Sequence, residues 1–325
     1  MTFTDLTKND STRAIVAGSP ATRRGRKKKE TALKERGVIS HADRKRKSVR
    51  IWLWIINTVA LIGLIFAGLG PLVWSARASV APTQDIISSP MSIFTSSFEW
   101  QNLTAAWNGA AIGRSMLNTV IVAAGATAMT LIVSILAAYL LSVMRPKWGP
   151  ILGGAILATL FLPGVISLVP MYLTILDVPG FHFSLLNTFW AVWLPAGANA
   201  FNVVVLRRFF DSIPREILEA AKIDGAGPLR VLTTIIMPLS TPIIGVVALL
   251  SLIGSWKDFL WPMLALPKQE LQPVSVVLPT LANGTAPLSV QMAAVFLTLL
   301  IPVVLFLIFQ KQFLRGVGTA GGLKG

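Results

Sequence analysis

Six long apolar stretches without a charged residue limit what this chain can fold into. They lie at Ile51–Ala76, Ser115–Met144, Trp148–Leu176, Val178–Leu206, Val231–Trp256 and Leu271–Gln310. Each exceeds the roughly 20 residues that an α-helix needs to cross the hydrocarbon core of a bilayer. The composition agrees, because only 13% of the residues are charged, against about 25% in soluble domains. The chain is therefore predicted to be an integral membrane protein.

The boundaries of the stretches predict an all-α domain over residues 51–325 with six transmembrane helices. The last stretch is too long for one helix, and Pro273, Pro279 and Gly284 assign its first half to a loop. The predicted spans are about 51–74, 118–143, 150–175, 187–206, 238–260 and 289–310. A polar loop at 207–237 separates the fourth span from the fifth.

Residues 1–50 form a basic tail ahead of the first span. They hold fifteen Lys and Arg against five Asp and Glu, a difference of +10. Such a tract cannot bury a core, so we expect disorder and attraction to anionic lipid headgroups. Binding of nucleic acid is the alternative, but no aromatic residues interleave the basic cluster to stack on bases.

The distribution of cations predicts the topology. If the N-terminus is cytoplasmic, the inner segments hold twenty-five Lys and Arg and the outer ones four. Because inner loops of membrane proteins are enriched in these residues, both termini and the loop at 207–237 are predicted to face the cytoplasm. The protein is expected to be a multi-pass protein of the bacterial plasma (inner) membrane.

The most informative polar segment is SIPREILEAAKIDGAGPLRVLTTIIMP, residues 212–238. Pro214 suits the first turn of a helix, and Gly225 suits the left-handed residue that ends one. Pro228 then opens a second helix, which gives a helix, a tight turn and a helix. Taken alone, this pattern also fits an ordinary amphipathic loop helix or a DNA-binding helix-turn-helix.

The spacing in this segment resembles the EAA loop of ATP-binding-cassette (ABC) importer permeases. That motif reads E-A-A, three residues, G, nine residues, I-x-L-P, and Met237 here replaces the usual Leu. The two side chains are similar in volume and both apolar, so the exchange is conservative. The resemblance implies the type I ABC importer permease fold, with a cytoplasmic EAA coupling helix that docks on a separate ATPase.

The resemblance also implies roles for individual residues in ATPase coupling. Glu219 would offer a carboxylate to the ATPase, and Ala220 and Ala221 would permit close approach of the backbone. Gly225 would allow the turn, with Asp224 capping the helix or forming an ion pair beside it. Pro238 would restart the fifth span, so that a push on the loop passes into a rigid helix.

Two further segments resemble the carbohydrate-uptake subgroup of these permeases, of the maltose-transporter type. Residues 256–262, WKDFLWP, are similar to its W-N-D-F-L-W-P, with Lys257 in place of Asn. Lys257 and Asp258, with Asn118 in the second span, are candidates for the substrate path, although Lys257 and Asp258 also suit the outer membrane interface. The ending TAGGLKG is similar to that of maltose-type permeases, which implies ATPase contacts by Gly321, Gly322 and Lys324.

No catalytic site is expected on this chain. It has no cysteine, and it lacks the G-x-x-x-x-G-K-[ST] loop that cradles nucleotide phosphates. ATP and Mg²⁺ are therefore expected on the partner ATPase, with no cofactor and no metal on this chain. The resemblance implies an ABC ATPase dimer, a second homologous permease, a solute-binding protein and a sugar as partners. The alternative is an ion-coupled secondary transporter or channel without an ATPase.

Overall fold

The computed structural model describes the backbone of residues 47–321 and the side chains of residues 47–304 and 307. Within this part of the chain every regular element is helical. Contacts divide the chain into two units, 1–69 and 70–325. The first unit contributes the beginning of helix α3 (Lys47–Val80), whose apolar side chains are largely exposed, as suits a helix surrounded by lipid or by another protein.

Two uninterrupted helices of the described residues are long and apolar enough to cross a membrane. They are α3 and the helix formed by α6 (Ile112–Tyr139) and the π-helix η2 (Leu140–Met144). Both extend several residues beyond the predicted spans. The shorter apolar part of α17 (Leu288–Gly321) occupies the last predicted span.

Two further pairs of apolar helices are sharply bent. Helix α7 (Gly149–Thr159) turns by 106° into η3 (Gly164–Ser167) and α8 (Leu168–Leu176). Pro163 and Gly164 lie at the bend, where a missing N–H and a missing side chain favour a break. The segment formed by α12 (Pro228–Val231), η4 (Leu232–Ile236) and α13 (Met237–Leu239) meets α14 (Thr241–Lys257) at 82°. Counting each bent pair as one span gives up to four candidates in the described residues.

The region of the predicted span at 187–206 is not one continuous helix. The chain forms α9 (Trp190–Ala196) and α10 (Ala200–Asp211), separated at Gly197–Asn199. The Asn199 side chain accepts a hydrogen bond from the Asn202 N–H and so caps the start of α10. A polar cap satisfies an amide that helix ends leave free, which favours the break here.

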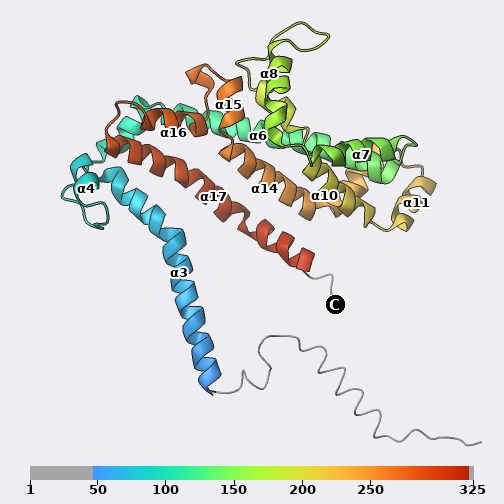
Figure 1. Ribbon diagram of the computed structural model, residues 1–325. Helices are drawn as coiled ribbons and strands as arrows, with labels where there is room; N and C mark the ends of the chain where they lie inside the picture. Colours follow the sequence, from blue (N-terminus) through green and yellow to red (C-terminus); the bar gives the residue numbers. More distant parts are fainter. Residues whose placement is uncertain (1–46, 322–325) are drawn as a thin grey trace, which may run out of the picture. The chain divides into compact units, whose positions relative to one another are not determined.

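Helix α6 is the centre of the second unit, where it contacts α14, α10, α9 and α16 (Val274–Ala282) (Figure 1). Small residues permit these close contacts. A Cβ on Gly125 would lie 2.1 Å from Cε2 of Trp193, and one on Gly197 would lie 2.9 Å from Cγ2 of Val133. The two glycines therefore make room for neighbouring side chains.

Candidate functional site

The EAA segment forms the helix α11 (Arg215–Ile223), with Pro214 at its N-cap. Glu216 lies in the first turn and Lys222 in the last, and both charges complement the helix dipole. Asp224 is the C-cap, and Gly225 follows with φ +73°, in the left-handed region. The prediction that Gly225 ends the helix as a left-handed residue is confirmed.

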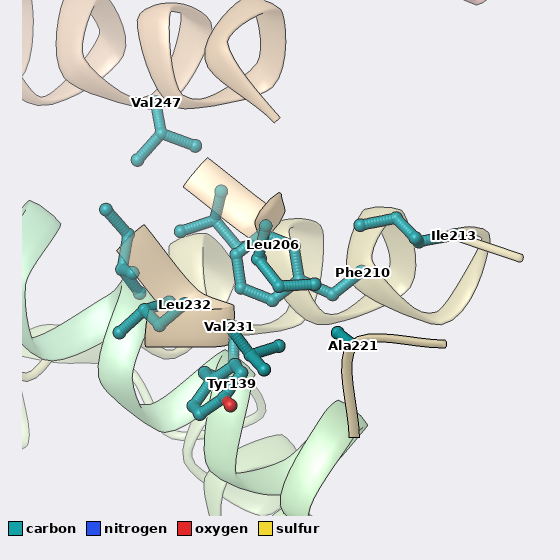
Figure 2. Packing of buried hydrophobic residues seen from close by; sticks show 11 residues of the cluster. Tyr139, Leu206, Phe210, Ile213, Ala221, Val231, Leu232 and Val247 are labelled. Atoms are coloured by element: carbon teal, nitrogen blue, oxygen red, sulfur yellow. The ribbon is translucent and has the colours of Figure 1, made fainter. Parts of the chain in front are cut away.

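The two alanines of the motif lie on different faces of α11. Ala221 is buried in an apolar cluster with Tyr139, Leu206, Phe210 and residues of the following segment (Figure 2). Ala220 and Glu219 are exposed. The small side chain of Ala221 therefore lets α11 pack on the chain's own core, and the role of the two alanines in close approach to the ATPase stays a prediction.

The exposed face of α11 carries charge beside apolar surface. Glu219, Lys222 and Asp224 are exposed, and so is Ile223, at 86% of its surface. Leu229, in the first turn of α12, is 72% exposed. Large aliphatic side chains beside charges, on a helix held from behind by a core, are typical of a protein-binding surface.

A partly buried hydrogen bond holds the turn between α11 and α12. Tyr139, in the last turn of α6, donates from its hydroxyl to the carbonyl oxygen of Pro228 at 2.8 Å. Pro228 is the first residue of α12, as predicted from its missing N–H. Movement of this turn is therefore linked directly to α6.

Pro238 does not begin the fifth span. It lies within α13, which ends at Leu239, and the bend follows at Ser240. The Ser240 N–H donates to the carbonyl oxygens of Ile236 and Met237, and its own carbonyl accepts from the N–H of Ile244. Pro238 is tolerated in the first turn of α13, and the chain bends two residues later. The expected single rigid helix is therefore two helices that meet at an angle.

An ion-pair cluster that the sequence did not single out lies where α10 meets the end of α6. Asp211 accepts hydrogen bonds from the Ser142 hydroxyl at 2.8 Å and from Nη2 of Arg145 at 3.1 Å. Nε of Arg207 lies 3.8 Å from the other Asp211 oxygen. A cavity of about 210 Å³ separates this cluster from Arg215, Glu219 and Lys222 of the α11 segment. In the sequence, the one sign of this cluster was that Arg145 and Arg207 each directly follow the end of an apolar stretch.

A polar cavity of about 550 Å³ lies among α6, α14 and the junction of α9 with α10. Lys257 and Asp258 both line it, with Thr130, Asn199, Asn202, Ser251 and Ser255 among the other lining residues. The two candidate substrate-path residues at the end of α14 are therefore brought together with polar groups of α6, of the start of α10 and of α14 itself.

Asn118 lies elsewhere. It is buried, and its Nδ2 donates to the carbonyl oxygens of Glu270 at 2.8 Å and Gln272 at 3.2 Å. Its neighbour Thr119 accepts a hydrogen bond from the Val274 N–H at 2.9 Å. In this conformation Asn118 and Thr119 thus hold the loop before α16, and Asn118 is not among the residues lining the polar cavity.

The candidate contacts near the C-terminus are only partly covered by the structure. Gly321 is the last residue of α17, whereas Gly322 and Lys324 lie outside the described residues. No group of three potential metal ligands occurs in the part of the chain that was described.

Comparison with known proteins identifies the family. Residues 130–318, more than half of the chain, match the model of the family described as "Binding-protein-dependent transport system inner membrane component". The chain belongs to this family. It is therefore a multi-pass permease subunit of a binding-protein-dependent ABC importer of the inner membrane.

Relatives of this permease extend the similarity almost to their full length. It is 29% identical over 272 residues to the sn-glycerol-3-phosphate transport system permease protein UgpE of Pectobacterium atrosepticum, covering 81% of this chain and 95% of the relative. It is 30% identical over 277 residues to the UgpE protein of Escherichia coli O1:K1 / APEC, covering 82% and 97%. A crystal structure of a bacterial ABC transporter involved in the import of the acidic polysaccharide alginate matches with a TM-score of 0.70 at 23% identity, covering 82% of this chain and 98% of that one.

Family membership settles the class of the protein. The permease is a transport subunit and not an enzyme, its family carries no cofactor, and the ATPase is a separate subunit. A binding-protein-dependent ABC complex implies an ATPase and a solute-binding protein as partners. The alternative of an ion-coupled transporter or channel without an ATPase is therefore set aside.

Proposed function

We propose that the permease forms half of a translocation path for a sugar, an oligosaccharide or a related polyol. The second half would come from a homologous permease, and the path would cross the membrane with six spans and both termini in the cytoplasm. The distribution of twenty-five against four cations supports this orientation. The relatives named for sn-glycerol 3-phosphate and alginate support a carbohydrate-like solute.

Coupling to ATP hydrolysis would run through α11, and one observation carries this proposal. Ala221 is buried in the apolar cluster that also contains Tyr139 and Phe210, while Glu219 and Ala220 on the same helix are exposed. A helix held in this way can receive force on one face and pass it to α6 and α10 through the other. Glu219 offers a carboxylate that can accept a charge-assisted hydrogen bond from the ATPase.

The loop would transmit this force by two further contacts. The Tyr139–Pro228 hydrogen bond links the turn after α11 to α6, and the Asp211 cluster links the end of α6 to α10 just before α11 begins. Gly321, Gly322 and Lys324 would add contacts to the ATPase from the C-terminus. Lys257 and Asp258 would lie along the solute path.

The test reconstitutes the intact complex, with its binding protein, in proteoliposomes. Solute accumulated per ATP hydrolysed is measured for the wild type, Glu219→Lys and Gly225→Pro. A charge-assisted hydrogen bond contributes about 1.5–3 kcal/mol, so Glu219→Lys should lower this ratio roughly tenfold or more.

The matched control is Glu99→Lys, the same charge change in a segment predicted to lie outside the membrane. It should insert equally well and keep the wild-type ratio. Equal transport per ATP by Glu219→Lys and the wild type would rule out α11 as the coupling element.

A further inference from the structure

The polar cavity is built as a small-molecule site. Its volume of about 550 Å³ lies within the range of about 300–1,000 Å³ that such sites occupy. Hydroxyl groups, amides and two charged groups line it, together with apolar Ala126, Phe201 and Leu250. Asn202 Nδ2 donates to the Ser251 hydroxyl at 3.2 Å, which holds polar groups of α10 and α14 together on the wall.

The two charged residues that line this cavity, Lys257 and Asp258, differ in their hydrogen bonds to the described residues. Oδ1 of Asp258 accepts from the Trp261 N–H at 3.4 Å, at the start of α15 (Leu260–Ala265), and the Asp258 carbonyl accepts from the Ser275 hydroxyl at 2.7 Å. Asp258 is thus engaged in the turn that follows α14. The Lys257 ammonium, in contrast, makes no ion pair or hydrogen bond with the described residues, although it lines the cavity.

A second part of the cavity lining, the start of α10, also favours negative charge. Asn199, Phe201 and Asn202 belong to the cap and first turn of α10, a helix of 12 residues. The N-terminus of a helix carries partial positive charge and attracts anions. An ammonium without a partner and a helix N-terminus therefore border the same space.

We infer that this cavity receives the anionic group of the transported solute, and that Lys257 binds it. The solute class is then a polyol or sugar bearing a phosphate or a carboxylate, with hydroxyl groups that hydrogen-bond to Asn199, Asn202 and Ser255. An ammonium provides a strong point-charge contact to such a group. This inference rests on the proposed function, because it takes the cavity to be part of the solute path.

The test exploits the lack of cysteine in the chain. Ser255→Cys places one thiol in the cavity of the purified intact complex, and its modification is followed on this subunit by mass spectrometry. Rates are measured with the anionic sulfonatoethyl and the cationic trimethylammonioethyl methanethiosulfonates. Adding Lys257→Asn should lower the ratio of anionic to cationic rates roughly tenfold, whereas Lys257→Arg should preserve it. An unchanged ratio in Lys257→Asn would overturn the inference.

Protection experiments identify the source of the anionic group. Slower modification of the Ser255→Cys complex in the presence of sn-glycerol 3-phosphate assigns a phosphate, and slower modification with glucuronate assigns a carboxylate. Protection by neither, or equal protection by neutral glycerol and glucose, overturns the assignment of the solute class. The labelling needs no ATP hydrolysis. If the transport-per-ATP test fails but anionic reagents still label faster than cationic ones, only the proposed role of α11 is refuted.

Discussion

The Tyr139 hydroxyl donates a hydrogen bond to the Pro228 carbonyl oxygen, and this bond joins the last turn of α6 to the first turn of α12. Tyr139 is 6% exposed, and it packs in the same apolar cluster as Ala221 of α11. One side chain is therefore hydrogen-bonded to the segment after the turn at Gly225 and belongs to the same apolar cluster as the helix before that turn.

Tyr139→Phe should weaken this connection. It removes the hydroxyl and leaves the Pro228 carbonyl without that donor, which should destabilise the folded state by about 0.5–1.5 kcal/mol. The thermal unfolding midpoint of the purified complex measures the effect, and solute transported per ATP should fall with it. The chain has one other tyrosine, Tyr172, whose hydroxyl makes no hydrogen bond with the described residues, so Tyr172→Phe is the matched control. Equal midpoints for the two variants would contradict the role given to Tyr139.

Gly225→Ala should strain the coupling turn without a steric clash. A Cβ at Gly225 would have nothing within 4 Å, but φ is +73°, where a side chain costs about 1–2 kcal/mol. Gly227→Ala is the control, because that residue has φ −69° and equally open surroundings. We expect lower stability and less transport per ATP for Gly225→Ala alone, in unfolding and uptake assays. The account fails if Gly227→Ala is as harmful.

Gly125→Ala should disturb the packing of α6 against α9. The new Cβ would lie 2.1 Å from the Trp193 ring, and such overpacking typically costs about 1–3 kcal/mol. The same change at Gly154 meets nothing within 4 Å and should be neutral or slightly favourable, because alanine stabilises a helix relative to glycine. The thermal unfolding midpoints of the two variants test this prediction. Equal midpoints for Gly125→Ala and Gly154→Ala would contradict it, because they would show that Trp193 moves aside at no cost in stability.

The ionised carboxylate of Asp85 should hold the segment after α3 in place from neutral to acidic pH. Its carboxylate accepts from the Ser96 N–H at 2.6 Å and from the Thr95 hydroxyl at 2.9 Å. The Ser96 N–H, followed by the hydroxyl bonds, holds the pKa of Asp85 below its usual value of 3.8. Because the pKa is lowered in the folded state, this contribution is complete above pH 3.8 and is lost as the pH falls through the lowered folded value.

Hydrogen exchange of the peptide spanning residues 83–100, corrected for intrinsic rates, measures this effect. Protection should stay constant from pH 7 to about pH 4 and should be lost at neutral pH in Asp85→Asn. Glu99→Gln, a neighbouring carboxylate without a side-chain hydrogen bond in the described part, should leave protection unchanged. Loss of protection already near pH 6 in the wild type would contradict the assignment.

The sequence predicted the helix of the EAA segment because the local signals agree there. The rings of Pro214 and Pro228 fix φ, and Gly225 can adopt the left-handed region because it has no side chain. Helices α11 and α12 begin and end beside these residues. The break at Pro163 and Gly164 follows from the same properties of proline and glycine, although the angle of 106° depends on contacts from elsewhere in the fold.

Contacts between residues that are far apart in the chain could not be predicted from the sequence. Asn118 was a candidate for the solute path, yet its hydrogen-bond partners lie 152 and 154 residues further along the chain. Asp211 was not singled out, because only the fold brings Ser142 and Arg145 to it. Ser240 carries no signal of its own for an 82° corner.

The most direct test of the central claim uses the two alanines of α11. Ala220→Cys and Ala221→Cys are made singly in this naturally cysteine-free chain, and the intact complex is treated with a thiol-to-amine crosslinker. The exposed position 220 should link to the ATPase subunit, and the buried position 221 should not. Failure of Ala220→Cys to link, together with linking from Ser97→Cys in the segment after α3, would contradict the account.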